Sequence, residues 1–220
     1  MDTSGGRITV SGIRSGADLE TSGGSIKVWD VAGGLRAETS GGSIEVRNLA
    51  GDLSATTSGG SIRLHDVRGA SRMETSGGGV TGSALAGPVH AATSGGPISL
   101  EHVGADIQAK TSGGSIRIAG AGGRVEAETS GGSIDVSFGR GNARGGALET
   151  SGGGIRVSLD PAVGLAIDAS GGRVTTSLPI RVAGEISRRR FQGTLGNGGE
   201  TLRMQVSGGS IRIEPLKAGS

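Results

Sequence analysis

Thr21-Ser-Gly-Gly-Ser-Ile-Lys-Val-Trp-Asp-Val-Ala-Gly-Gly-Leu-Arg-Ala-Glu38 is one copy of an 18-residue unit that repeats along most of the chain. Its opening tetrapeptide, Thr-Ser-Gly-Gly, occurs in eight copies that are separated by the same constant step. These copies begin at Thr3, Thr21, Thr39, Thr57, Thr75, Thr93, Thr111 and Thr129. A fixed period of this length is typical of stacked repeat architectures.

Apolar and polar residues alternate within each unit, which is the period of a half-buried β-strand. Ile26 and Val28 have even numbers, whereas Leu35 and Ala37 have odd numbers, so the phase changes twice in each repeat. One change falls near Asp30 and the other in Thr-Ser-Gly-Gly, and each requires a corner or a bulge. We expect the glycines at both corners to adopt positive φ, and Asp or Asn at the first corner suits a turn.

Two short strands and two corners in every 18-residue unit predict one rung of a single all-β solenoid, a β-helix-like fold. We expect about 12 rungs, with each rung hydrogen-bonded to the next at a spacing of about 4.8 Å. Residues 1–137 form the regular repeats, and residues 138–220 form irregular C-terminal rungs and a cap of the same domain. A row of antiparallel hairpins is the alternative, but it does not explain the constant period.

Equivalent positions of successive repeats form apolar columns. One column contains Ile8, Ile26, Ile44, Ile62, Val80, Ile98, Ile116 and Ile134. Two neighbouring columns of the returning strand compensate in volume, because Ser71 is small where Met73 is large. Since protein interiors are close-packed, these two positions are expected to share one core. Met73 is also expected to fill the space that Gly82 leaves.

The composition limits the class of protein. The chain has 47 glycines and 1% aromatic residues, but 33% of its residues are apolar and its net charge is +2. Disorder requires low hydrophobicity and high net charge, so the glycines must have defined places in a fold. The chain has no cysteine, which excludes disulfides, thiolate metal sites and cysteine nucleophiles.

Targeting signals are not evident in the sequence. No apolar run approaches the roughly 20 residues of a membrane helix, and no signal peptide precedes the first repeat. Since the repeat begins at Thr3, we expect the natural N-terminus to lie upstream of Met1.

The C-terminal quarter departs from the regular spacing. After Gly132 the step becomes wider and uneven, and the motif returns at Thr150, then as Ala169-Ser-Gly-Gly, and finally as Ser207-Gly208-Gly209. The segment 186–199 is interpreted as a long excursion that covers the open end of the solenoid, because repeat proteins need atypical terminal units. Its Arg188-Arg189-Arg190 run is interpreted as a solvated loop instead of a nucleic-acid, glycan or lipid contact.

We predict no catalytic, metal or cofactor site. The three histidines, His65, His90 and His102, fall in different columns, and Asp66 shares the corner column of His102 but lies two rungs away. A polysaccharide-acting enzyme would require clustered carboxylates or His and Arg on adjacent rungs, so it is a less favoured alternative.

Other ligands known from glycine-rich or solenoid proteins fit the repeat poorly. Calcium-binding nonapeptides need a Gly-x-Asp in the turn, where this chain has Ile or Val. A phosphate loop needs a following helix N-terminus, which is not predicted here. Ice binding requires an exposed threonine ladder, whereas alternation places Thr21, Thr39 and Thr57 at the inward side of a corner.

The repeated Thr-Ser-Gly-Gly-Ser-Ile-x-Val resembles the adhesin-like β-strand-repeat family of bacteria, a domain of unknown function. The segment from Gly198 to Ile213 is similar to the end of that domain. The resemblance covers nearly the whole chain and implies a β-solenoid in a bacterial envelope or secreted context, often behind a signal peptide or membrane anchor. It provides no catalytic motif, and this chain departs from the family in the regularity of its first eight repeats.

These observations predict a non-enzymatic, extracytoplasmic rod for adhesion or envelope interaction, with a cell-surface glycan or protein as its ligand. The alternative is a scaffold that self-associates end to end through its N-terminal edge. We expect no nucleic-acid partner, no cofactor and no membrane span.

Overall fold

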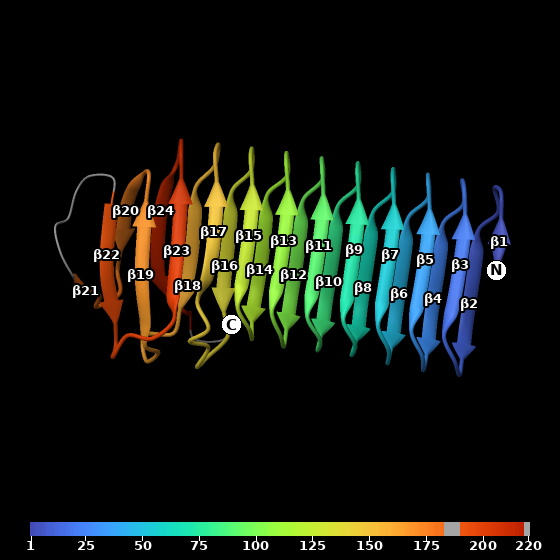
Figure 1. The fold of residues 1–220 in the computed structure, drawn as a ribbon, viewed down its shortest axis with the longest axis horizontal. Helices are drawn as coiled ribbons and strands as arrows, with labels where there is room; N and C mark the ends of the chain where they lie inside the picture. The colour runs from blue at the N-terminus through green and yellow to red at the C-terminus, as the bar shows by residue number, and fades with distance from the viewer. Residues whose placement is uncertain (183–189, 218–220) are drawn as a thin grey trace.

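Through most of the chain, strands alternate between two stacked sheets, in a computed structural model that describes residues 1–182 and 190–217. The strands lie across the long axis of a rod, and each turn of the chain adds one layer to it (Figure 1). No helix occurs in the described residues. The fold is therefore the all-β solenoid that the repeat predicts, with roughly 18 residues per rung.

Sheet A contains 13 strands and sheet B contains 11 in the described part of the chain. The strands of sheet A are β1 (Asp2–Thr3), β3 (Ala17–Thr21), β5 (Leu35–Thr39), β7 (Leu53–Thr57), β9 (Ser71–Thr75), β11 (Val89–Thr93), β13 (Ile107–Thr111), β15 (Val125–Thr129), β17 (Gly146–Thr150), β19 (Leu165–Ser170), β21 (Arg181–Val182), β22 (Arg190–Leu195) and β23 (Thr201–Val206). Those of sheet B are β2 (Ile8–Ile13), β4 (Ile26–Val31), β6 (Ile44–Leu49), β8 (Ile62–Val67), β10 (Val80–Leu85), β12 (Ile98–Val103), β14 (Ile116–Ala121), β16 (Ile134–Phe138), β18 (Ile155–Leu159), β20 (Arg173–Thr176) and β24 (Ser210–Pro215).

Each regular turn pairs in parallel with the next, in a register that follows the repeat of the sequence. Ile26, for example, lies between Ile8 and Ile44, so like side chains stack above like. The inward columns of both sheets are buried and form one continuous core. Since β-branched and leucine side chains fill this thin space, the core needs almost no aromatic residues.

The solenoid has about nine turns, which corrects the expected number of about 12. Up to β18 the layers follow the order of the chain, and after β18 they do not. β23 pairs with β17 on one side and with β19 on the other, and β24 likewise lies between β18 and β20 (Figure 1).

The end of sheet A has a different geometry. β22 runs antiparallel to β19, and β21 runs antiparallel to β22 at the last position of the sheet. The sequence interpretation of 186–199 as an excursion falls partly on residues 183–189, which lie outside the described residues and include Arg188 and Arg189. Arg190 begins β22.

The first corner holds one residue in the left-handed backbone region in each turn from β2 to β14. Asp30, Asn48 and Asp66 have φ between 54° and 61°, which Asp and Asn tolerate better than most residues. Ala84 and His102 occupy the same column with φ of 55° and 53°. The phase change predicted near Asp30 is therefore a single-residue kink within the strand.

The second corner uses its glycines for a different reason than we expected. Neither glycine of the eight regular Thr-Ser-Gly-Gly segments has a positive φ, so the expectation of positive φ is wrong there. The second glycine is required by close approach instead: a Cβ on Gly78 would lie 2.0 Å from the carbonyl oxygen of Gly60 in the preceding turn. A Cβ on Gly77 would lie 3.5 Å from the nearest backbone oxygen, an ordinary contact.

Buried threonines connect the second corners of successive turns. Each Thr hydroxyl donates a hydrogen bond to the carbonyl oxygen of the second glycine in the preceding segment, at 2.7–3.1 Å. The same hydroxyl accepts one from the N–H of its own second glycine at 3.2–3.3 Å. This column, which we call the threonine ladder, comprises Thr21, Thr39, Thr57, Thr75, Thr93, Thr111, Thr129 and Thr150. It faces inward, as the alternation predicts.

The volume compensation at Ser71 and Met73 is present in the core. Both side chains are buried, and Ser71 Oγ has no hydrogen-bond partner. The expectation that Met73 fills the space at Gly82 is wrong. Leu85 and Leu100 occupy it, because their methyl groups would lie 2.8 Å and 3.1 Å from a Cβ at that position.

The two glycines of one corner provide a matched test of the close approach. We expect Gly78→Ala to lower the free energy of unfolding by about 3 kcal/mol or more, since the new methyl group must push two turns apart. Gly77→Ala is expected to change it by no more than about 0.5 kcal/mol. Denaturant titration followed by circular dichroism measures both, and equal effects would contradict the steric explanation.

The threonine ladder is testable by removing one hydroxyl. Thr75→Val keeps the shape of the side chain but leaves the Gly60 carbonyl and the Gly78 N–H without a partner. Because unsatisfied buried groups are destabilising, we expect a loss of about 1–3 kcal/mol, whereas Thr75→Ser should retain most of the stability. The same titration measures both variants, and a Val variant as stable as the wild type would show that the ladder contributes little.

Candidate binding surfaces

The three histidines lie at separate places on the rod. His65 on sheet B contacts Ser83 Oγ through Nδ1 at 2.8 Å, and His90 on sheet A contacts Gln108 Oε1 through Nδ1 at 2.7 Å. His102 occupies the kinked corner, two turns from Asp66 in the same column. The structure therefore does not bring them together into one cluster. No group of three or more metal-ligating side chains occurs among the residues that the structure describes.

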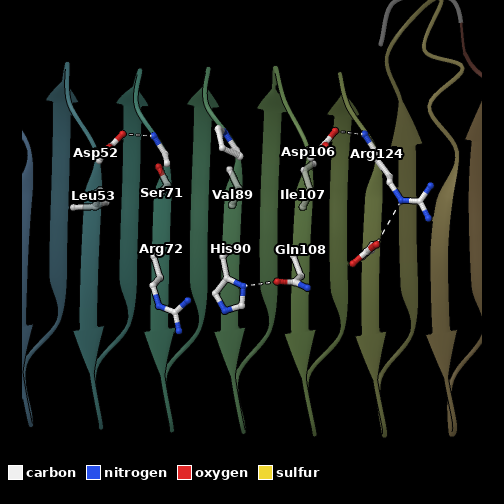
Figure 2. A pocket seen from close by; sticks show the side chains of 13 residues that line it. Asp52, Leu53, Ser71, Arg72, Val89, His90, Asp106, Ile107, Gln108 and Arg124 are labelled. Carbon is white, nitrogen blue, oxygen red and sulfur yellow. Dashed lines mark hydrogen bonds and ion pairs between the residues drawn. The ribbon is translucent and has the colours of Figure 1, made fainter.

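A shallow hollow of about 430 Å³ lies on the outer side of sheet A, beside the first corner (Figure 2). Arg72, His90 and Gln108 stand on adjacent strands along it, and His90 points toward Gln108. Asp52 and Asp106 lie at its corner side. Each accepts a hydrogen bond at 2.8 Å from a backbone N–H in the next turn, Asp52 from Ala70 and Asp106 from Arg124.

Both arginines of this hollow have carboxylate partners. Arg72 forms an ion pair with Glu74 on its own strand. Arg124 lies 3.5 Å from a Glu126 oxygen and 3.8 Å from a Glu200 oxygen. Since the two aspartates hold the corner and the arginines have carboxylate partners, the polar groups of this hollow support the solenoid itself.

A second hollow, of about 500 Å³, lies on the outer side of sheet B around Trp29. Trp29 is the only tryptophan of the chain, and it is 38% exposed, whereas its neighbour Val28 is 1% exposed. The other exposed large apolar side chains of the described residues, Met1 and Val182, lie near the two ends of the rod. The residues around this hollow are Lys27, Val28, Trp29, Glu45, Arg47 and Asn48.

Charged groups beside Trp29 are paired with one another. Lys27 Nζ lies 3.2 Å from one oxygen of Glu45, and the Arg47 guanidinium donates to the other oxygen from Nε at 3.0 Å and from Nη2 at 2.7 Å. The hydrogen bonds from Lys27 and then from Arg47 hold the pKa of Glu45 below its usual range. Trp29 lies opposite Arg47 in the strand register. The ring is therefore adjacent to a preformed cluster of Lys27, Glu45 and Arg47, which we call the Glu45 cluster.

Neither the Glu45 cluster nor the tryptophan beside it was identified from the sequence. Alternation places Lys27, Glu45 and Trp29 on the outer face, and the Lys27–Glu45 pair follows from their register. Trp29 was not predicted as a site residue, although an aromatic residue at an outward position of such an aromatic-poor chain was the available signal.

Comparisons with known proteins identify no relative of this chain. No family model, no curated protein and no solved structure matches this chain. The described residues include no helix with the length and hydropathy of a membrane span. The class of protein shown by the structure is a two-sheet β-solenoid of stacked turns that follow the sequence repeat.

Proposed function

We propose that the chain is a non-enzymatic surface-interaction scaffold, an adhesin-like rod that binds a cell-surface glycan through the Trp29 hollow. The observation that carries this proposal is the exposure of Trp29 on a rod that buries nearly all of its other large apolar side chains. An exposed aromatic ring beside ordered polar groups does not serve the core. It is, however, what a binding surface for an amphipathic ligand requires.

The chemistry of the hollow favours a carbohydrate. A sugar ring has an apolar C–H face that can pack on an indole, and hydroxyls around its edge that need hydrogen-bond partners. Trp29 supplies a rigid apolar surface, since an aromatic side chain has few rotatable bonds to order. Lys27 and Arg47 each have more N–H donors than their bonds to Glu45 use, because Lys has three and Arg has five.

The architecture also suits the presentation of a ligand site on the surface of the rod. Repeated layers hold every outward column at a fixed spacing, so a ligand site on one turn keeps its geometry without a loop. An extended glycan along the flat outer side of sheet B would contact Trp29 and then polar residues of neighbouring turns. The resemblance to adhesin-like repeats supports a bacterial, extracytoplasmic setting.

Trp29 provides its own spectroscopic probe, because the chain contains no other tryptophan and no tyrosine. We expect a glycan identified by array screening to change the indole fluorescence on titration. Trp29→Ala should weaken binding about tenfold or more, since an aromatic contact contributes ~0.5–1.5 kcal/mol beyond the area it buries. Calorimetry measures the affinity of variants that lack the fluorophore.

Two controls make the result specific. Trp29→Phe keeps an aromatic ring and should retain part of the affinity, and His90→Ala on sheet A should bind like the wild type. Unchanged affinity in Trp29→Ala would show that the ligand binds elsewhere. Hydrolysis of any array polymer would contradict the non-enzymatic part of the proposal.

End-to-end association is the second candidate function, and the edge of sheet B favours it. β2 has a strand neighbour on one side only, and Val10 and Ile13 are partly buried there against the core. The backbone groups along the outer side of such an edge are available for pairing with another strand.

Light scattering across a concentration series tests this association. We expect the mass to rise with concentration and Val10→Lys to reduce the rise, since an inward-pointing charge on an edge strand opposes pairing. A rod that stays monomeric at high concentration would remove this candidate without affecting glycan binding.

A further inference from the structure

The C-terminal rung, which we define as residues 201–215 with strands β23 and β24, lies inside the stack instead of at its end (Figure 1). In sheet A the order is β17, β23, β19, and in sheet B it is β18, β24, β20. All four flanking strands precede this rung in the sequence. The layer between β17–β18 and β19–β20 is therefore left open at first, and we call it the slot. The chain continues through β22 and then returns to fill the slot.

Both walls of the slot match the rung that occupies it. Leu202 pairs in register with Gly146 on β17 and with Ile167 on β19. Ile211 pairs likewise with Ile155 on β18 and with Val174 on β20. All of these contacts are parallel, like those of the regular turns.

The rung contributes strongly to the core. The five inward side chains of the rung are fully or almost fully buried: Leu202, Met204, Val206, Ile211 and Ile213. Without the C-terminal rung, β17 and β19 would each have an unpaired edge where β23 now lies, and β18 and β20 would each have one where β24 now lies. Unpaired parallel edges beside an open apolar core are strong acceptors for another strand of the same pattern.

The connection to the rung contains few residues and several glycines. Residues 196–200 join β22 to β23, and Gly196, Gly198 and Gly199 have φ of 58°, 76° and 152°. A Cβ on Gly196 would lie 2.8 Å from the Val163 carbonyl oxygen, so this conformation is specified by its surroundings. A hinge that adopts a special backbone conformation in one chain can extend to place the same rung in another, which is the geometry of domain swapping.

From these observations we infer that the slot between β17–β18 and β19–β20 is a strand-acceptor site, and that a second copy of this chain can supply the C-terminal rung to it. The partner is a copy of the same chain, because the slot selects the pattern of its own rung. During folding the slot stays open until the last residues arrive, so an identical rung from another copy competes with the internal one at high concentration.

Disulfide trapping tests the exchange without background, because the chain has no cysteine. Glu149 on β17 and Gln205 on β23 are exposed partners in the register of adjacent strands, a separation that a disulfide can bridge. One preparation carries Glu149→Cys and another carries Gln205→Cys. They are mixed, unfolded and refolded together at a series of concentrations under oxidising conditions.

We expect a disulfide-linked dimer that contains one chain of each kind, increases with concentration and has the circular dichroism of the folded rod. The matched control is Thr56→Cys mixed with Glu74→Cys, which are register partners on successive turns of the continuous coil. These turns have no independent free end to exchange, so the control mixture should give at least tenfold less linked dimer.

Three results would overturn the inference. In the first, the Glu149→Cys and Gln205→Cys mixture gives no linked dimer although the double variant closes its internal disulfide completely. In the second, the control pair gives as much dimer, which would mean that collisions form the link. In the third, the double variant fails to close its disulfide, which would contradict the position of β23 beside β17. End-to-end association gives none of these links, so the two modes of self-association are distinguishable.

Discussion

At the second glycine of each regular Thr-Ser-Gly-Gly segment, successive turns of this solenoid lie too close together for any side chain. A carbonyl oxygen of one turn occupies the place where a side chain of the next would begin, and the buried threonine hydroxyl bonds both peptide groups. This contact supports the register of both sheets, because a shift by one residue would turn every apolar column outward, and in one direction it would also place a serine Cβ against that oxygen in most turns. The parallel strands and the thin core depend on this register.

The regular turns could be predicted from the sequence because their signals are local. Alternation and a constant step are enough to assign Ile26 to the core, Lys27 to the surface and Thr39 to the inner corner. The role of the glycines was not predictable in the same way, since both positive φ and close approach select glycine. The C-terminal order was also hidden. The step from Thr150 to Ala169 is close to that of the regular repeat and suits adjacent layers, yet the layer of Val206 lies between them.

The two outer surfaces illustrate why function was harder to predict than fold. Polar side chains of sheet A, such as Asp52 and Arg124, are bound to neighbouring turns and support the coil. On sheet B, Lys27 and Arg47 hold Glu45, but Trp29 has no comparable task. From the sequence alone, all of these residues are simply outward positions. Only the three-dimensional arrangement separates side chains that stabilise the rod from one that is available to a ligand.

The uniform parallel register of the regular turns has a consequence for how such a protein can change over evolutionary time. A tandem duplication or a loss of one complete unit between β8 and β15 would add or remove one layer of about 4.8 Å and leave every remaining corner and column in phase. The length of the rod is thus set by the number of repeat units that the gene encodes. The chemistry at Trp29 and the closure at the C-terminal end would be inherited unchanged.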